Sequence, residues 1–339
     1  MSEAELPWEI LQGKTVLVTG ATGMLALYVT WLLLYIREHR DIDVNIVALC
    51  RNKTKAEQCF ANYMGKGYFH LLLQDVCKPI DYDGSIDYVI HLAGNASPHY
   101  INTDPVGIMR CNLQGTISVL ELARKKGCKK VMFASTREVY GKNESSELMD
   151  EKDFGTLDPL DDRSCYPESK RAAETLLRSY YLQYHINYNI LRIAHSYGPT
   201  MNLENDGRVM ADLMADIVSG KDIVLKSKGD AVRAFLYITD AVIGMFTVLF
   251  KGAEAEVYNL SNETEPISIK TLAETLVSLN PSVKVVYQIP DESMKGYCTY
   301  RRTALDTTAI EHLGWHPRVS LAEGLQRTFN AKTQINQRE

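Results

Sequence analysis

The feature that most constrains the fold is a glycine turn between an apolar strand pattern and a helix pattern. Residues 14–19 form a short β-branched run, and a buried helix pattern extends from Met24 to Ile36. Between them, Gly20 allows a tight turn and Gly23 lets the backbone approach a pyrophosphate. The helix N-terminus supplies amide donors for an anion. A tight turn without a ligand is the alternative, but this order of elements favours a dinucleotide site.

Strand and helix patterns then alternate along the chain. Strands are expected at residues 45–49, 70–74, 88–93, 130–134 and 189–193, with a helix from about 104 to 126. Such alternation predicts an α/β fold with a doubly wound parallel sheet, whose ligands bind beyond the carboxyl ends of the strands. The polar motifs of this chain follow those ends.

Two parts are expected. Residues 1–190 should form mainly the dinucleotide-binding Rossmann domain, and residues 191–339 mainly a smaller substrate-binding lobe, with the chain crossing back to the sheet. Short helical patterns at 267–279 and 321–329 belong to that lobe. The polar tail 332–339 is expected to fray.

The second strand pattern ends in Arg51, and no acid follows it. An acid at this position usually binds the ribose 2′-hydroxyl of NAD, whereas arginine accommodates the 2′-phosphate of NADP. Arg51 therefore favours NADP over NAD, with a solvated Arg/Lys cluster as an equal alternative. Asp75 and Val76 follow the third strand and suit the adenine edge.

A tyrosine and a lysine begin another helix pattern. Tyr166 and Lys170 are four residues apart, so their side chains project from one helix face. We expect the Lys170 ammonium group to lower the Tyr166 pKa and make the phenol an acid/base near neutral pH, with Thr136 as its hydroxyl partner. This spacing also occurs in surface pairs, and the glycine turn is what favours catalysis here.

Composition excludes several classes of partner. A formal net charge of −5 over 339 residues gives no basic surface for nucleic acid. The seven cysteines include no Cys-x-x-Cys pair, which indicates free thiols in a reducing compartment and offers no metal motif. The apolar run from Met24 to Ile36 is too short to span a bilayer, and the acidic N-terminus lacks a signal peptide. We expect a cytoplasmic protein that binds neither nucleic acid nor membrane.

Several motifs occur together in order. They are the glycine turn, Ser135-Thr136-Arg137-Glu138-Val139-Tyr140-Gly141, Tyr166-x-x-x-Lys170, Gly198-Pro199, Arg233-Ala234-Phe235 and Leu313-Gly314-Trp315. Together they resemble the extended short-chain dehydrogenase/reductase superfamily of nucleotide-sugar enzymes over nearly the whole chain. Within this superfamily the pattern is most similar to the UDP-glucuronate decarboxylase group.

The resemblance implies three sets of site residues. Catalysis is assigned to Thr136, Glu138, Tyr166 and Lys170. The nicotinamide cofactor is expected to contact Gly20, Thr22, Gly23, Met24, Arg51, Asp75, Val76, Leu92, Ala93, Tyr166 and Lys170. The nucleotide-sugar substrate is expected to contact Ser97, Arg137, His195, Arg208, Arg233 and Arg301. For Arg208 and Arg233, a surface arginine is the alternative. A homodimer is also implied, through the helices that follow Asp104 and Tyr166.

The mechanism implied by the resemblance starts with oxidation of the sugar at C4. Tyr166 as phenolate takes the C4 hydroxyl proton while the nicotinamide takes the hydride, Lys170 holds the phenolate and the nicotinamide ribose, and Thr136 binds the reacting oxygen. The resulting 4-keto sugar can then undergo epimerisation, 4,6-dehydration, decarboxylation or reduction. Glu138 either deprotonates C5, orients a water molecule or forms a salt bridge.

Three departures from the family pattern affect the choice of reaction. Arg137 stands where the dehydratases usually have aspartic acid and the decarboxylases serine, and arginine cannot act as a general acid. It either contacts a substrate carboxylate or faces solvent. His195 replaces the usual asparagine at the substrate phosphate. Arg301 resembles an active-site arginine of the decarboxylases, although the neighbouring proline is absent.

Decarboxylation is the leading reaction on this pattern. The alternatives are a nucleotide-sugar epimerase, a 4,6-dehydratase, an NADPH-dependent 4-keto-sugar reductase and a non-catalytic NAD(P)-binding regulator. Arg51 favours the reductase. The intact set of Thr136, Tyr166 and Lys170 argues against the regulator, which would need the glycine turn but no acid/base group.

Overall fold

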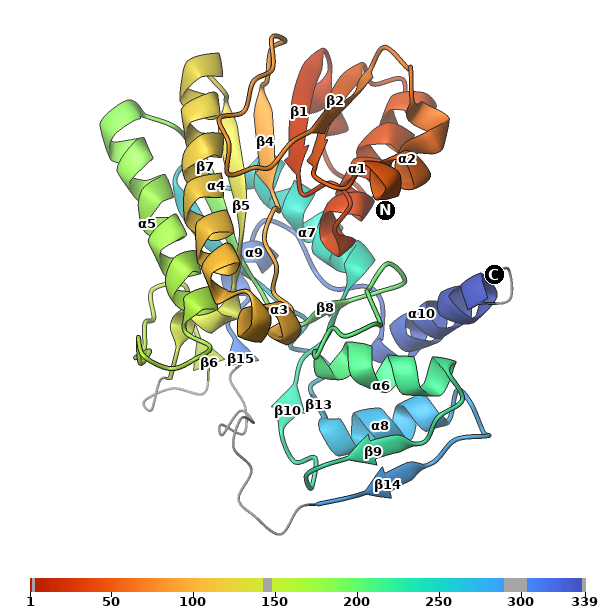
Figure 1. The fold of residues 1–339 in the computed structure, drawn as a ribbon. Coiled ribbons are helices and arrows are strands. Elements are labelled where there is room, and N and C mark those ends of the chain that lie inside the picture. The colour runs from red at the N-terminus through yellow and green to blue at the C-terminus, as the bar shows by residue number, and fades with distance from the viewer. Residues whose placement is uncertain (2–3, 143–147, 290–303, 337–339) are drawn as a thin grey trace.

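The computed structural model describes residues 1, 4–142, 148–289 and 304–336. A central sheet of seven parallel strands has the order β12-β7-β5-β4-β1-β2-β3 (Figure 1). Its strands are β1 (Lys14–Thr19), β2 (Val44–Cys50), β3 (Phe69–Leu73), β4 (Tyr88–His91), β5 (Lys130–Thr136), β7 (Tyr188–Ile193) and β12 (Glu256–Leu260). The order reverses between β1 and β4, as in the doubly wound dinucleotide-binding fold. The predicted fold class is confirmed.

The glycine turn lies where the sequence pattern places it. Strand β1 is buried from Thr15 onward because helices cover both faces of the sheet, which explains its continuous apolar pattern. Gly20 has a φ of +67°, and a Cβ there would lie 2.9 Å from the Cα of Ala93. Only glycine fits this turn without displacing the neighbouring backbone. Helix α1 (Met24–His39) follows and continues one turn beyond the expected end.

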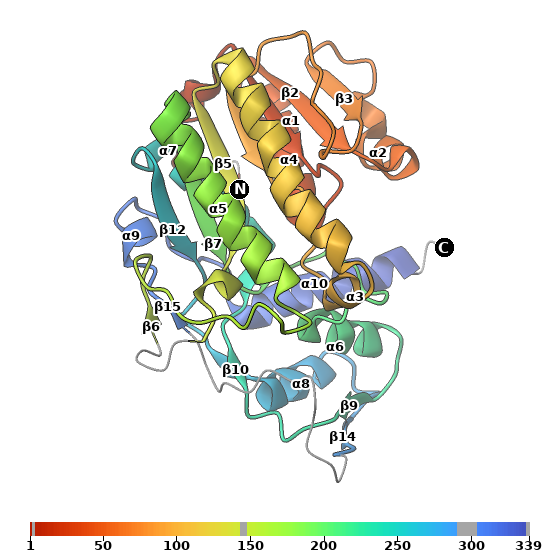
Figure 2. The ribbon, with the colours of Figure 1, turned by 60° about the vertical axis from the view of Figure 1, so that its left-hand side comes forward.

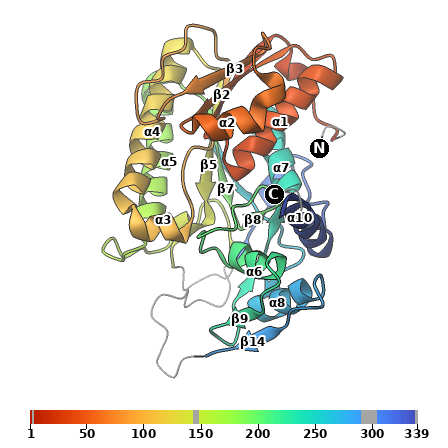
Figure 3. The same cartoon turned by 45° about the vertical axis from the view of Figure 1, so that its right-hand side comes forward.

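Helices cover the two faces of the sheet. Helices α4 (Pro105–Lys126) and α5 (Cys165–Tyr184) lie side by side on one face (Figure 2). Helices α1 and α7 (Ile238–Lys251) pack together on the other face, with α2 (Lys53–Phe60) at the β2–β3 side (Figure 3). Each face buries its own apolar core, so both helix pairs are held on the sheet by hydrophobic burial.

A smaller lobe lies beyond the carboxyl ends of the strands (Figure 1). Its elements are α6 (Val209–Val218), β9 (Ile223–Leu225), β10 (Val232–Arg233), β13 (Ile267–Ser268), α8 (Ile269–Val277) and β14 (Val285–Tyr287). Met214, Ile217 and Leu272 belong to a separate core within it. Strand β9 pairs with β14 and β10 with β13, so segments distant in sequence are joined there.

The remaining elements lie in or between these two parts. They are η1 (Trp8–Leu11), η2 (Ala61–Tyr63), α3 (Pro98–Thr103), η3 (Arg137–Tyr140), β6 (Leu148–Met149), β8 (Ser196–Tyr197), β11 (Leu236–Tyr237), β15 (Ala304–Leu305), α9 (Thr308–Glu311) and α10 (Leu321–Asn336). The chain returns to the main sheet through α7 and β12, which pairs with β7. The expected fraying from residue 332 is wrong as far as Asn336, because α10 continues to that residue. Across the described ranges, no helix combines the length and apolarity required to span a membrane.

Candidate active site

Helix α5 presents Tyr166 and Lys170 on its buried face. Each side chain is only 5% exposed, although lysine is among the residues least often buried. Tyr166 hydrogen-bonds the hydroxyl of Thr136 at the carboxyl end of β5. Thr136 also accepts a hydrogen bond from the Glu138 backbone amide at 3.3 Å, which starts the short turn η3. The structure thus brings Thr136, Tyr166 and Lys170 to the ends of the parallel strands.

The electrostatics of Tyr166 differ from the expectation. Burial raises the pKa of the phenol, and the charge of Glu138 raises it further, while the Thr136 hydrogen bond and the charge of Arg208 act in the opposite direction. The Lys170 ammonium group instead donates to the Ala134 carbonyl at 2.8 Å. The predicted lowering of the Tyr166 pKa by Lys170 is therefore wrong for this structure, since desolvation dominates.

The Lys170 ammonium group also lies against an aromatic ring. Its ammonium nitrogen lies 4.5 Å from the centre of the Phe133 ring. Burial lowers the pKa of Lys170 to about 8, against the raising effects of Cys111 and Glu174. An ammonium group with this pKa is mostly charged at neutral pH and can release its proton within a moderately alkaline range.

Two buried polar groups beside Lys170 were given no role from the sequence. His91 shares a 2.7 Å hydrogen bond with Thr19, whose hydroxyl also accepts from the amides of Leu92 and Ala93 at 3.1 Å each. Burial, followed by the charge of Lys170, lowers the pKa of His91 to about 3, so this imidazole is neutral. It fixes the β4 turn that faces the glycine turn. Buried polar residues at the ends of two adjacent strands were the available signal.

The second group is Asn112 on α4, which donates to Ser169 at 2.9 Å. Its side-chain oxygen is buried and has no hydrogen-bond partner within the described part of the chain. A Cβ at Gly94 would lie 3.1 Å from this oxygen and 3.4 Å from the Lys170 ammonium nitrogen. An acceptor and a donor therefore flank a position that glycine keeps open, which suits the hydroxyl groups of a ribose.

The glycine turn offers a second part of the dinucleotide site. Gly23 precedes α1, and no described side chain caps the first turn of that helix, so its amides are free for an anion. Thr22 is half-buried in the turn, Gly23 is exposed, and Met24 begins the helix. Leu92 and Ala93 lie across from Gly20. These groups fit a dinucleotide whose pyrophosphate lies at the helix N-terminus.

The residues predicted at the adenine edge, Arg51, Asp75 and Val76, lie at the ends of the second and third strands. A hydrogen bond from the Cys77 amide lowers the pKa of Asp75, and the charges of Arg51 and Arg110 lower it further against the effect of burial. Arg51 is exposed and lies close to Asp75. Val76 is buried against α4. The polar groups expected at this edge therefore occur together.

Three predicted substrate contacts meet on the lobe side. Burial lowers the pKa of His195 well below its usual range, and the charges of Arg137 and Arg233 lower it further. His195 has a φ of +37°, and its ring centre lies 5.7 Å from that of Phe235. Arg233 donates to the Val232 carbonyl at 2.8 Å. The charges of two guanidinium groups thus act on one buried imidazole.

Arg208 directly precedes α6, and its charge acts on Tyr166. It binds the buried carboxylate of Asp206 through two hydrogen bonds of 2.5 and 2.8 Å. The Ser97 hydroxyl donates to the Asp206 carbonyl at 2.6 Å, so Ser97 fastens this loop to the turn after β4. Glu138 forms a long ion pair of 3.9 Å with Arg163. Arg301 lies outside the described residues.

A Rossmann sheet, a phosphate-compatible glycine turn and a buried Tyr–Lys pair define a nicotinamide-dinucleotide enzyme. The particular family follows from comparison with known proteins. The chain belongs to the NAD dependent epimerase/dehydratase family, whose model matches residues 16–261. The predicted superfamily is therefore confirmed.

Named relatives cover nearly the whole chain. UDP-glucuronic acid decarboxylase 5 of Arabidopsis thaliana is 33% identical over 314 residues, which is 91% of this chain and 86% of the relative. UDP-glucuronic acid decarboxylase 1 of Xenopus tropicalis is 29% identical over 320 residues, 94% of this chain and 72% of the relative.

Solved structures share the fold. UDP-glucose 4-epimerase from Thermotoga maritima superimposes with a TM-score of 0.80 at 24% identity, covering 96% of this chain and 100% of that one. The dTDP-glucose 4,6-dehydratase from Bacillus anthracis gives a TM-score of 0.76 at 19% identity, covering 96% and 98%. The likeness extends through both the sheet and the smaller lobe.

Proposed function

We propose that the protein is a UDP-glucuronate decarboxylase that acts through a transient 4-keto sugar. The observation that carries this proposal is that Arg137, which directly follows Thr136, and Arg233 both act by their charge on the buried His195. A substrate with both a diphosphate and a carboxylate needs more than one cation, because buried anions are costly unless they are paired. The named decarboxylase relatives support the same assignment.

In this proposal Tyr166 takes the proton of the C4 hydroxyl, and Thr136 hydrogen-bonds the same oxygen. A bound oxidised nicotinamide would supply a hydride acceptor and a positive charge. Such a charge opposes the burial that raises the pKa of Tyr166. Lys170 holds the ribose hydroxyls together with the side-chain oxygen of Asn112, which faces the same opening at Gly94.

Arg137 is assigned to the C6 carboxylate. Its guanidinium group can bind a carboxylate in a bidentate manner but cannot protonate a leaving hydroxyl, which disfavours dehydration. Loss of carbon dioxide from a 4-keto acid needs no acid at this position. The interaction must weaken as the carboxylate charge moves into the enolate. Arg137 therefore orients the substrate without strongly stabilising the bound substrate relative to the transition state.

Arg208 and Arg233 are assigned to the diphosphate, with His195 as a further hydrogen-bond donor. Asp206 holds the Arg208 guanidinium group in place, and Ser97 in turn holds the Asp206 backbone. Arg301 remains a predicted carboxylate contact. Glu138 is assigned to proton transfer at C5, with Arg163 close enough to hold its carboxylate.

On the basis of Arg51, we assign NADP as the preferred dinucleotide. The side chain is exposed and lies close to Asp75, so it can reach a 2′-phosphate at the adenine edge. Calorimetric titration with NAD⁺ and NADP⁺ tests this assignment. Tighter binding of NAD⁺ would overturn it without affecting the assignment of the reaction.

We assign the interface of a homodimer to the outer surface of α4 and α5. Exposed apolar side chains on these helices include Val106, Met109 and Leu182, which are 75%, 40% and 62% exposed. Closed two-fold dimers are also the commonest assembly. Sedimentation velocity should give a dimer at micromolar concentration, and a monomer throughout that range would contradict the assignment.

The reaction is tested by incubating the pure protein with UDP-glucuronate and each dinucleotide, followed by mass spectrometry. The expected product is a UDP-pentose lighter by the mass of carbon dioxide. A product of unchanged mass with an inverted ring centre would identify an epimerase. Turnover confined to NADPH and a 4-keto sugar would identify a reductase.

A further inference from the structure

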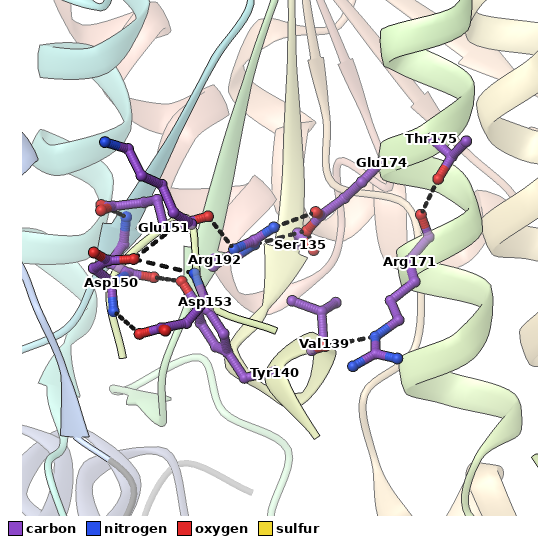
Figure 4. A network of polar contacts seen from close by, with 12 residues as sticks. Ser135, Val139, Tyr140, Asp150, Glu151, Asp153, Arg171, Glu174, Thr175 and Arg192 are labelled. Atoms are coloured by element: carbon purple, nitrogen blue, oxygen red, sulfur yellow. Dashed lines mark hydrogen bonds and ion pairs between the residues drawn. The ribbon is translucent and has the colours of Figure 1, made fainter. Parts of the chain in front are cut away.

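A buried ion pair joins Glu174 of α5 to Arg192 of β7 (Figure 4). The Glu174 carboxylate accepts hydrogen bonds from Arg192 at 2.8 and 3.2 Å, and from the Ser135 hydroxyl at 2.5 Å. The side chains of Glu174 and Arg192 are only 12% and 13% exposed. A carboxylate removed from water to this extent, and bound by two partners, differs from an exposed surface ion pair.

The partners of Glu174 connect three elements of the site. Glu174 lies one helical turn after Lys170, so both project from neighbouring positions on α5. Ser135 immediately precedes Thr136 on β5, and Arg192 belongs to the adjacent strand β7. One carboxylate therefore joins the helix that carries the Tyr–Lys pair to the strand end that carries the hydroxyl partner.

Arg192 is itself held on its other sides. It donates to the Glu151 carbonyl at 3.0 Å, and its guanidinium carbon lies 4.8 Å from the centre of the Tyr140 ring. The Tyr140 hydroxyl donates to the Asn259 side-chain oxygen at 2.6 Å, which fixes the ring. The guanidinium group is therefore a fixed anchor for Glu174 and has little freedom to follow a displaced helix.

Glu174 also acts on the charge of Lys170. The groups facing the ammonium from other elements are Cys111 on α4, neutral His91 on β4, and the Phe133 ring and Ala134 carbonyl on β5. Glu174 supplies a carboxylate charge from the same helix. Burial lowers the pKa of Lys170 to about 8, and Glu174 opposes this effect. Without it, a larger fraction of Lys170 would be neutral near pH 7.

We propose that Glu174 is a positioning residue of the reaction, which fixes Lys170 relative to Thr136 through Ser135 and Arg192 and keeps the Lys170 ammonium group charged. This role rests on the proposed function, in which Lys170 and Thr136 act on the cofactor and the substrate. Glu174 itself touches neither. Its effect is transmitted through the position of α5 and through its charge.

The first test measures Lys170 without any substrate. Wild type and Glu174→Gln are labelled competitively with acetic anhydride over a range of pH, and acetylation of the Lys170 peptide is followed by mass spectrometry. The titration midpoint of Lys170 should shift to lower pH in Glu174→Gln. Glu121→Gln is the matched control, because Glu121 on α4 bonds Tyr180 of α5 without contacting Ser135 or Arg192. The titration midpoint of Lys170 in this variant should equal that of wild type. An unchanged midpoint in folded Glu174→Gln overturns the electrostatic part.

The second test uses turnover. Glu174→Gln should reduce kcat by roughly 100-fold and Ser135→Ala by roughly 10-fold, because small displacements of catalytic groups are costly. Glu174→Asp should recover part of the loss. A merely structural role would lower the unfolding midpoint while leaving kcat and the Lys170 titration of the folded protein unchanged, and this result would refute the proposal.

If Glu174→Gln does not fold, the double variant Glu174→Gln/Arg192→Gln leaves no unpaired buried charge and replaces it in both measurements. If wild type does not turn over UDP-glucuronate, the proposed function fails, whereas the Lys170 titration still supports or overturns the effect of Glu174.

Discussion

Replacement of Tyr166 by phenylalanine should abolish turnover while leaving the fold intact. The ring is 5% exposed and packs with Ile101 and Ile108, and phenylalanine preserves these contacts. The hydroxyl contributes one hydrogen bond, with Thr136. Its loss costs about 0.5–1.5 kcal/mol of unfolding free energy. At roughly 2 cal/mol/K of unfolding entropy per residue, this lowers the melting temperature of a chain of this length by only about 1–2 °C.

The loss in rate should be far larger, since one positioned acid/base contributes roughly 10²–10⁴-fold. The assay follows UDP-glucuronate consumption for wild type, Tyr166→Phe and the control Tyr180→Phe, whose hydroxyl bonds Glu121 on α4, at the interface between the two helices. Dinucleotide affinity is measured in parallel and should be unchanged in both variants. Activity of Tyr166→Phe near that of wild type would remove the phenol from the mechanism, and a melting temperature lowered by tens of degrees would refute the packing argument.

Three further outcomes are expected. Arg51→Ala should weaken NADP⁺ binding by roughly tenfold through loss of a charge-assisted phosphate contact, with NAD⁺ binding and the control Lys53→Ala unaffected in calorimetry. Arg192→Leu should leave Glu174 buried without its ion-pair partner and cost about 3–5 kcal/mol in urea unfolding, whereas Arg327→Leu, which breaks a half-exposed pair, should leave the midpoint nearly unchanged. Burial lowers the pKa of Lys170 from 10.5 to about 8, so the unfolded chain binds more protons than the folded chain between these two pH values. The free energy of unfolding should therefore rise with pH across that window. Lys170→Met should flatten this part of the plot of urea midpoint against pH.

Local patterns predicted the dinucleotide-binding half of the fold well. Every strand expected from the sequence is present with ends displaced by at most two residues, because a parallel strand covered on both faces has a continuous apolar pattern. Strand β12 was not identified beforehand. Its sequence includes Glu256 and Asn259, and its place at the sheet edge depends on pairing with β7 across a long separation in sequence.

The site was predictable by position but less so by energetics. Residues at strand ends converge in any doubly wound sheet, which is why Thr136, Tyr166 and Lys170 could be placed together. The raised pKa of Tyr166 could not be anticipated, because it depends on the depth of burial and on where the Lys170 ammonium group points. The Glu174–Arg192 pair was likewise hidden, since nothing in the sequence indicates which arginine will face a given carboxylate.

The most direct test of the account follows the C6 carbon of the substrate. UDP-glucuronate isotopically labelled at C6 is incubated with the protein and its preferred dinucleotide, and nuclear magnetic resonance monitors the labelled carbon, with Tyr166→Phe as the blank. We predict that the label appears as carbon dioxide and bicarbonate in step with formation of a UDP-pentose. Turnover of the sugar with the label retained in the nucleotide sugar would contradict the assignment as a decarboxylase.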